Sequence, residues 1–142
     1  MHILITSGGT SEAIDSVRSI TNHSTGSLGK IIAETALTKG HQVTLITTPT
    51  ALKPQPHPQL KLLVINNVEE LRTHMQKEVP HHQVLIHAMA VSDYTPVYMT
   101  GLEAVEKAPD LHRFLQQKNQ ETKLSSNEEY QVLFLKKNPK II

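Results

Sequence analysis

Cysteine is absent from the 142 residues of this chain. The chain therefore holds no disulfide framework, no cysteine-based zinc site and no cysteine nucleophile. Aromatic residues make up only 4% of the sequence, so we expect an aliphatic core. No apolar run approaches the roughly 18 residues that cross a membrane, and we expect no membrane partner.

An excess of charge of one sign is also lacking. The formal net charge of +1 is too balanced for a protein that attracts a polyanion in bulk, so we expect no nucleic-acid partner. The start, Met1-His2-Ile3-Leu4-Ile5, has no basic segment and no cleavage site, unlike a signal peptide, and we expect a cytoplasmic protein. The length suits one domain or most of one, and we assign residues 1–142 to a single, incomplete Rossmann-like domain.

The first part of the chain alternates strand and helix patterns. Ile3–Thr6 is an apolar run without alternation, which is typical of a strand buried on both faces. A helix is predicted next, ended by Lys39-Gly40, and His41–Thr47 is a second predicted strand. The positions at helical spacing that define this helix are Leu28, Ile31, Ile32, Thr35 and Ala36.

A second strand–helix–strand pattern follows a proline-rich connection. Leu60–Ile65 and Gln83–Ala88 are predicted strands, and Asn67 with Glu70 forms a predicted capping box at the start of the helix between them. The expected buried face of that helix consists of Val68, Leu71, Met75 and Val79. This order predicts an α/β fold, a Rossmann-like, doubly wound and mainly parallel sheet whose carboxyl-terminal part is missing.

The remainder of the chain is less regular. Thr95-Pro96 interrupts the pattern, and Leu102–Gln117 resembles a helix that Pro109 splits. Two further elements are predicted, a strand at Tyr130–Leu135 and a basic turn at Lys136–Lys140.

Ser7–Gly29 is a candidate ligand loop between the first strand and the first helix. Glycines let the backbone approach a ligand closely, and a helix start presents N–H groups to an anion. The spacing fits neither G-x-G-x-x-G nor G-x-x-x-x-G-K-[ST], and an ordinary loop with capping residues is the alternative. The candidate phosphate contacts are Gly8, Gly9, Thr10, His23, Ser24, Thr25 and Gly26.

Asp93 follows the fourth strand, at the sheet edge where open α/β proteins bind ligands. Its carboxylate could bind ribose hydroxyls or orient a magnesium-bound phosphate, and Ala88 and Ala90 leave room for a flat base. The alternative is that Asp93 caps a turn.

Lysines supply a third candidate site. Lys123, Lys137 and Lys140 could act as point charges for phosphate, with a solvated basic face as the alternative. The nine histidines are scattered, and no spacing indicates a metal cage, so no metal ligand is assigned. His81-His82 is interpreted as a surface turn.

Four stretches, in this order, resemble one enzyme family. The first contains Thr6-Ser7-Gly8-Gly9-Thr10, then Asp15-Ser16-Val17-Arg18, then Ile20-Thr21-Asn22-His23-Ser24-Thr25-Gly26-Ser27-Leu28-Gly29. The others are Met89–Tyr94, Lys123–Ser126 and Lys136–Ile141. Together they resemble the signature of phosphopantothenate–cysteine ligase, an enzyme of coenzyme A biosynthesis, and they extend over nearly the whole chain.

The resemblance implies a two-step ligation. CTP activates the carboxylate of 4′-phosphopantothenate as an acyl-cytidylate, with release of pyrophosphate, and the amine of cysteine then displaces CMP. The resemblance also implies Mg²⁺ with the CTP co-substrate and a homodimer, with residues 95–123 as a flap that covers the site and pairs the subunits. Such an enzyme mainly positions two anions and neutralises their charge.

Matching positions imply roles for single residues. Asn22 matches the asparagine that holds the intermediate and its carbonyl, Arg18 the arginine that supports this loop, and Lys123 the lysine needed for acyl-cytidylate formation. The implied nucleotide contacts are His87, Ala88, Met89, Asp93, Lys123, Lys137, Asn138, Pro139 and Lys140.

The chain departs from the family pattern at three places. Met89 stands where the family often has alanine, so we expect a reshaped base pocket. Ser125-Ser126 replaces two lysines, and Lys140 replaces an acidic residue. Because family members are longer, we expect a truncated form with weak or no activity.

Three other functions are weighed against the ligase. An NAD(P)- or flavin-dependent oxidoreductase would need G-x-G-x-x-G after the first strand and an acidic residue closing the second, where the chain has Thr47-Thr48-Pro49. The decarboxylase of the same pathway would need a flavin site and a catalytic cysteine. A non-catalytic nucleotide-binding Rossmann module is the third alternative.

Overall fold

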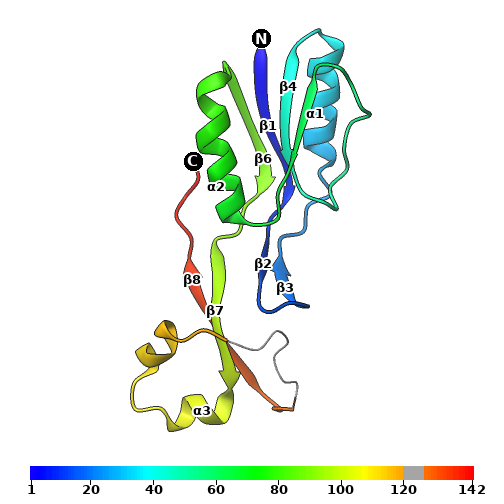
Figure 1. Cartoon of the computed structure of the whole chain (residues 1–142). Helices are drawn as coiled ribbons and strands as arrows, with labels where there is room; N and C mark the ends of the chain where they lie inside the picture. The colour runs from blue at the N-terminus through cyan, green and yellow to red at the C-terminus, as the bar shows by residue number, and fades with distance from the viewer. Residues whose placement is uncertain (120–126) are drawn as a thin grey trace. The chain divides into compact units, whose positions relative to one another are not determined.

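A computed structural model describes residues 1–119 and 127–142 (Figure 1). In chain order, the elements are β1 (His2–Gly9), β2 (Ser11–Ala13), β3 (Ser19–Thr21), α1 (Ser27–Thr38), β4 (Gln42–Thr47), β5 (Leu60–Val64), α2 (Val68–Glu78), the 3-10 turn η1 (Val79–His81), β6 (Val84–Ala90), β7 (Tyr94–Gly101), α3 (Leu102–Lys107), the 3-10 segment η2 (Leu111–Gln116) and β8 (Gln131–Lys137).

The chain forms two compact units. The sheet unit consists of Met1–Ser11, Thr21–Ser92 and Ile141, and the hairpin unit of Glu12–Ile20, Asp93–Lys140 and Ile142. Every helix within the described residues is too short or too polar to cross a bilayer.

The sheet unit is a parallel four-stranded sheet with the strand order β5-β4-β1-β6. Helix α1 packs on one face, against the aliphatic residues of β1 and β4, and α2 packs on the other (Figure 1). The central strands are buried on both faces, as their uninterrupted apolar runs predict. The predicted Rossmann-like α/β fold and its parallel strands are therefore confirmed.

Helix α1 occurs as predicted, but only part of the set at helical spacing packs on the sheet. Leu28 and Ile31 are 63% and 56% exposed. The residues that pack on the sheet are Gly29, Ala33, Ala36 and Leu37, with Ile32 partly buried. Small residues fill this face because α1 lies close against β1: a Cβ on Gly29 would collide with the side chain of Ser7. The predicted end of the helix is confirmed, since Gly40 has φ +85° and donates its N–H to the Leu37 carbonyl.

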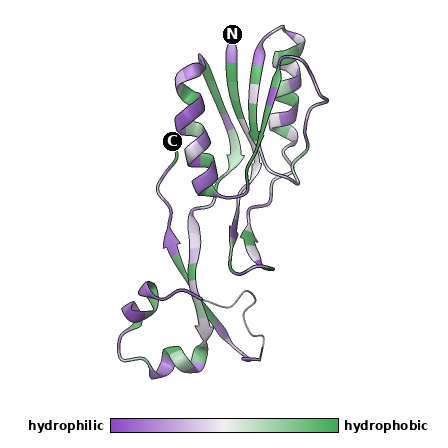
Figure 2. Ribbon diagram, viewed as in Figure 1, coloured by the Kyte–Doolittle hydropathy of each residue, from purple (hydrophilic) through white to green (hydrophobic). Residues whose placement is uncertain are grey.

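Helix α2 begins as predicted and ends differently. The Asn67 side chain accepts a hydrogen bond from the Glu70 N–H (2.9 Å), whereas the Glu70 carboxylate accepts from the N–H of Asn66 rather than of Asn67 (2.6 Å). Pro80 lies in the 3-10 turn that follows, and Val79 is 42% exposed, contrary to the predicted buried face. Glu78 is buried in its place. Hydrophilic residues cover much of α2, and hydrophobic residues concentrate on the strands (Figure 2).

The hairpin unit is built on the antiparallel pair β7–β8. Thr95-Pro96 does not end the pattern as expected, because β7 continues through Pro96 with an irregular register between Pro96 and Tyr98. The predicted strand at 130–135 is confirmed in β8, but β8 extends to Lys137, so Lys136 and Lys137 lie in a strand and not in a turn. The predicted split at Pro109 is confirmed by α3 and η2.

The core of the hairpin unit is aromatic. The Phe114 ring stacks between Tyr98 (centroids 5.9 Å apart) and Phe134 (5.3 Å), and Phe114 is 2% exposed. The expectation of an aliphatic core is therefore confirmed for the sheet unit and wrong for the hairpin unit, which contains both phenylalanines of the chain.

Candidate functional site

Asn22 lies against the end of β1. A Cβ on Gly9 would collide with the Asn22 carbonyl oxygen, so a glycine at this position lets the two backbone segments meet. The Asn22 N–H donates to the Thr10 carbonyl (3.1 Å). Two backbone contacts therefore fix the residue that carries the predicted catalytic amide, and its side chain is not part of the buried core.

Thr10 ties the ends of two strands together. Its Oγ1 lies 2.6 Å from Ser92 Oγ and accepts the Ser92 N–H (2.8 Å), while its own N–H donates to the Ala90 carbonyl (3.1 Å). Thr10 has no exposed surface. Its hydroxyl therefore holds β1 to the end of β6, and Ser92 is a positioning residue that the sequence pattern did not single out.

The start of α1 is held by the loop after β4. Gly26 is the N-cap of α1 with φ +78°, and a Cβ there would meet Ala51 and the Leu52 nitrogen. The Leu52 N–H donates to the Thr25 carbonyl (2.9 Å). Gly9 and Gly26, which were predicted to let the backbone approach a ligand, thus lie against other segments of this chain. His23, Ser24 and Thr25 are exposed.

Lys53 stabilises the same loop, and sequence reasoning missed it. Its ammonium group donates to the carbonyl oxygens of Thr48 (2.9 Å), Pro49 (3.0 Å) and Ala51 (2.8 Å). An ammonium has three hydrogens, so these acceptors occupy all of them. Proline-rich sequence around it predicted only an irregular connection.

Arg18 supports the turn between β2 and β3, two short strands within the predicted loop between the first strand and the first helix. The Asp15 carboxylate accepts from the Arg18 Nε (3.0 Å), Nη2 (2.7 Å) and N–H (2.7 Å), and from the Val17 N–H (2.9 Å). The Asp15 side chain is 1% exposed. The guanidinium therefore holds a local turn, in agreement with a supporting role for this residue.

His87, Ala88 and Met89 lie consecutively on β6, near its carboxyl end. His87 Nδ1 is 2.6 Å from the buried Thr6 hydroxyl, and partial burial of the ring lowers the pKa of His87. The Met89 side chain is buried in the core with Leu4 and Met75. Because the Met89 side chain lies in the core, its backbone is the part expected to face a nucleotide, and the reshaped base pocket stays a prediction.

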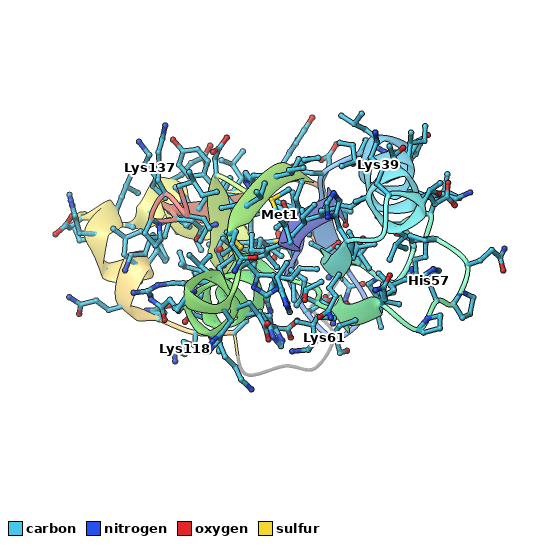
Figure 3. All side chains as sticks on the ribbon, turned by 90° about the horizontal axis from the view of Figure 1, so that it is seen from above. Met1, Lys39, His57, Lys61, Lys118 and Lys137 are labelled. Carbon is cyan, nitrogen blue, oxygen red and sulfur yellow. The ribbon has the colours of Figure 1, made fainter. Side chains whose placement is uncertain are left out.

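The hairpin unit brings together predicted residues from two distant motifs. Tyr94 is paired with Lys137 in the β7–β8 register, and the Asn138 N–H donates to the Asp93 carbonyl (2.7 Å). Asp93 and Lys137 (labelled in Figure 3) are exposed. Pro139 and Lys140 follow as exposed residues. Lys123, Ser125 and Ser126 lie outside the described residues.

Glu12 is a buried acidic residue that sequence reasoning did not consider. It is 3% exposed, and the Thr95 hydroxyl lies 3.1 Å from its Oε1. The only signal in the sequence is its place between two matched parts of the first motif, Thr10 and Asp15. No group of three or more metal-binding side chains occurs among residues 1–119 and 127–142.

A hollow of about 480 Å³ lies elsewhere, at the amino ends of β1, β4 and β5. Its lining includes His2, Thr44, Lys61 and His82, and none of the predicted site residues. His82 was expected in a surface turn, but its two ring nitrogens contact the Glu78 carbonyl (2.6 Å) and the Thr44 hydroxyl (2.8 Å). Within the sheet unit, Asn22 and Met89 lie instead near the carboxyl ends of β1 and β6.

Relatives of this chain in sequence and structure include proteins named for coenzyme A biosynthesis and for pantothenate metabolism. The coenzyme A biosynthesis bifunctional protein CoaBC of Vibrio vulnificus is 39% identical over 94 residues, which are 66% of this chain and 23% of that protein. The crystal structure of the DNA/pantothenate metabolism flavoprotein from Streptococcus pneumoniae is 64% identical with a TM-score of 0.93, over 99% of this chain and 61% of that one. The C-terminal domain of a CoaBC protein is 37% identical with a TM-score of 0.62, over 68% of this chain and 48% of that one.

These relatives are longer, and the chain spans 23% of the length of the curated protein from Vibrio vulnificus. The family described as DNA/pantothenate metabolism flavoprotein C-terminal domain matches residues 1–110, which include β1 to β7 and the whole parallel sheet. The chain therefore belongs to the DNA/pantothenate metabolism flavoprotein C-terminal domain family.

Proposed function

We propose that this chain carries a phosphopantothenate–cysteine ligase site that uses CTP. The observation that carries the proposal is the pairing of β7 with β8, which joins the Asp93 motif to the Lys137–Lys140 motif through the Asn138–Asp93 hydrogen bond (2.7 Å). Two stretches separated by more than forty residues meet only in the fold, and both match the nucleotide motifs of the ligase. The names of the relatives support the same pathway.

In the proposed reaction, the chain first binds CTP together with its Mg²⁺. Asp93 supplies one exposed carboxylate, which suits a metal that the nucleotide phosphates hold for the most part. Lys137 and Lys140 add charge beside the phosphates, and Lys123 has the same proposed role from outside the described residues. The α-phosphorus then accepts the carboxylate oxygen of 4′-phosphopantothenate, and pyrophosphate leaves.

The second step is attack by the cysteine amine on the acyl carbon. The carbonyl oxygen gains negative charge as the new C–N bond forms, and CMP leaves as the bond to phosphate breaks. An amide N–H of Asn22 is the proposed donor to that oxygen. Because the amide is neutral, it can stabilise the oxyanion without competing for the neighbouring phosphates. The backbone contacts at Gly9 and Thr10 hold it in one place before substrate arrives.

Calorimetry with CTP, ATP, NAD and 4′-phosphopantothenate tests the proposal. We expect heat from CTP and 4′-phosphopantothenate and little from NAD. Preference for NAD, or no response to any of the four, would refute the ligase site. A pyrophosphate-release assay with all three substrates then separates a weakly active ligase from a non-catalytic nucleotide-binding module, and Lys123→Gln should abolish that release.

A homodimer is part of the proposal because the ligase family implies it. The segment proposed as a flap, residues 95–123, contains β7, α3 and η2 in its described part. Analytical ultracentrifugation measures the mass directly. A monomer at concentrations well above those of the activity assay would remove the dimer from the proposal.

A further inference from the structure

Glu12 is a buried carboxyl group that the proposed reaction does not use. It is 3% exposed, on β2, in the hairpin unit. Burying a carboxylate is costly unless hydrogen bonds compensate for the lost water. A neutral side chain such as serine or glutamine at this position would avoid that cost, so the buried carboxyl group needs a physical account.

Thr95 connects Glu12 to the proposed nucleotide segment. Its Oγ1 lies 3.1 Å from Glu12 Oε1 and 2.7 Å from the Asn138 side-chain oxygen. A hydroxyl has one hydrogen to donate and also accepts. When the nitrogen of the Asn138 amide faces Thr95, the amide N–H donates to the Thr95 oxygen and the Thr95 O–H donates to the Glu12 carboxylate. Two consecutive hydrogen bonds then link the three side chains.

Asn138 is then held at two points. Its backbone N–H donates to the Asp93 carbonyl (2.7 Å), and its side chain meets the Thr95 hydroxyl (2.7 Å). The residues that follow β8 have no further strand partner in the described pairing, which ends at Tyr94–Lys137. The contacts of Asn138 therefore help to fix the direction in which the chain leaves β8.

We propose that Glu12 is a positioning residue that acts through Thr95 on Asn138 and so orients the Lys137–Lys140 segment for the nucleotide. This inference rests on the proposed function, since that function assigns the nucleotide to this segment. The direction in which CTP affinity changes distinguishes positioning from a simple effect of charge. A carboxylate near a triphosphate repels it, so by charge alone the loss of Glu12 would tighten CTP binding, whereas the loss of a positioning contact weakens it.

The test is a double-mutant cycle on the 142-residue chain, with CTP binding measured by calorimetry and folding by thermal unfolding. Thr95→Val removes the hydroxyl at nearly constant volume, Thr95→Ser keeps it, and Glu12→Gln removes the charge. Glu69→Gln is the matched control, because this carboxylate is exposed, lies outside the proposed site and contacts only Arg72 among the described ion pairs (3.9 Å).

We expect Thr95→Val to weaken CTP binding by roughly fivefold to tenfold, the range that one or two hydrogen bonds contribute. Glu12→Gln should weaken it by roughly twofold to fivefold, because a charge-assisted hydrogen bond becomes a neutral one. Thr95→Ser should restore binding to within about twofold of the unaltered chain, and Glu69→Gln should leave it unchanged. The double variant should bind no more weakly than Thr95→Val alone, since both changes interrupt one series of contacts.

Independent effects of Glu12 and Thr95, tighter binding by Glu12→Gln, or unchanged binding by Thr95→Val would each overturn the positioning role while the proposed function stands. An unaltered chain that binds no CTP would overturn both. A Thr95→Val chain that unfolds at a much lower temperature, together with a Thr95→Ser chain that still binds CTP weakly, would assign the hydroxyl to folding alone and would also overturn the inference.

Discussion

At the scale of single residues, Gly9 shows how a backbone contact can position Asn22, the residue proposed to stabilise the oxyanion. Gly9→Ala places a methyl group against the Asn22 carbonyl oxygen. We expect a loss of roughly 1–3 kcal/mol in the free energy of unfolding, as for other overpacked sites, and a shift in the backbone amide resonances of Asn22 and Thr10. Denaturant unfolding and two-dimensional NMR measure both.

The control is Gly40→Ala. Gly40 has φ +85° and open space around its Cβ position, so its substitution costs roughly 1–2 kcal/mol of backbone strain without touching the site. The two variants therefore resemble each other in stability and differ at Asn22. Unmoved Asn22 resonances in Gly9→Ala would show that the loop does not depend on this contact.

Asn22 itself gives the second prediction at this scale. Asn22→Ala removes the side-chain N–H donor without adding a charge near the phosphates, so it removes the proposed stabilisation of the oxyanion. We expect CTP binding to change by about twofold or less and formation of the ligated product to fall by about 10²- to 10³-fold. Calorimetry and a coupled product assay are the measurements, and loss of CTP binding instead would contradict the role assigned to the amide.

Sequence reasoning found the polar motif residues because the identity of a residue is enough to give the chemistry of its side chain. It could not find what those residues contact. Thr10 was taken for a phosphate contact, but its hydroxyl is buried against Ser92, which lies 82 positions away. Met89 and Glu12 are similar cases, since only the packing shows that the methionine belongs to the core and that the acid lies beside Thr95.

At the scale of elements, the ion pair of Glu78 with Lys61 links α2 to the edge strand β5. Lys61, labelled in Figure 3, donates to the Glu78 carboxylate at 2.7 Å. This hydrogen bond is the main cause that lowers the pKa of Glu78 below its ordinary value of 4.5, against the opposing effect of burial. The folded state therefore favours the ionised form.

The sign of the pH dependence follows from that shift. The stabilisation is fully present above the ordinary pKa of the carboxyl group and is lost as the pH falls through its lower, folded-state value. We expect Glu78→Gln to lose about 1–2 kcal/mol at pH 7 and to show a shallower loss of stability below pH 4.5 than the unaltered chain.

Unfolding in urea across a series of pH values measures the effect. Glu69→Gln is the matched control on the same helix, because Glu69 is 72% exposed and its contact with Arg72 is long (3.9 Å). It should change stability by roughly 0.5 kcal/mol or less at every pH. Equal curves for Glu78→Gln and the unaltered chain would contradict the role of the pair.

The elements that periodicity predicted well are those buried on the parallel sheet. The strands and helices of the sheet unit occur where the apolar runs indicated, because burial on two faces or on one stripe leaves a strong pattern. The short strands β2 and β3 left none, since their residues are polar and their turn depends on the Asp15–Arg18 contacts. Strand β7 was obscured by Pro96, which an irregular register tolerates.

At the scale of the whole molecule, two cores with different side chains predict two cooperative regions. Phe114→Ala removes the central ring of the aromatic stack, and we expect it to cost roughly 3–5 kcal/mol in the hairpin unit. Amide hydrogen exchange should show lost protection in β7 and β8 and retained protection in β1 and β4. The matched variant is Leu45→Ala, in the aliphatic core of the sheet unit, with the opposite pattern.

The outcome distinguishes two descriptions of the protein. Loss of protection confined to one unit in each variant supports two regions that open separately. Loss throughout the chain in both variants would show a single cooperative structure, and one free energy of unfolding would then describe all of it.

The separation of aromatic from aliphatic cores also has an optical consequence. All three tyrosines, Tyr94, Tyr98 and Tyr130, belong to the hairpin unit, and the chain has no tryptophan. Intrinsic ultraviolet emission therefore originates in that unit alone, and the parallel sheet contributes none. A change in tyrosine emission on adding nucleotide would report directly on the segment that contains Asp93 and Asn138, without an attached dye.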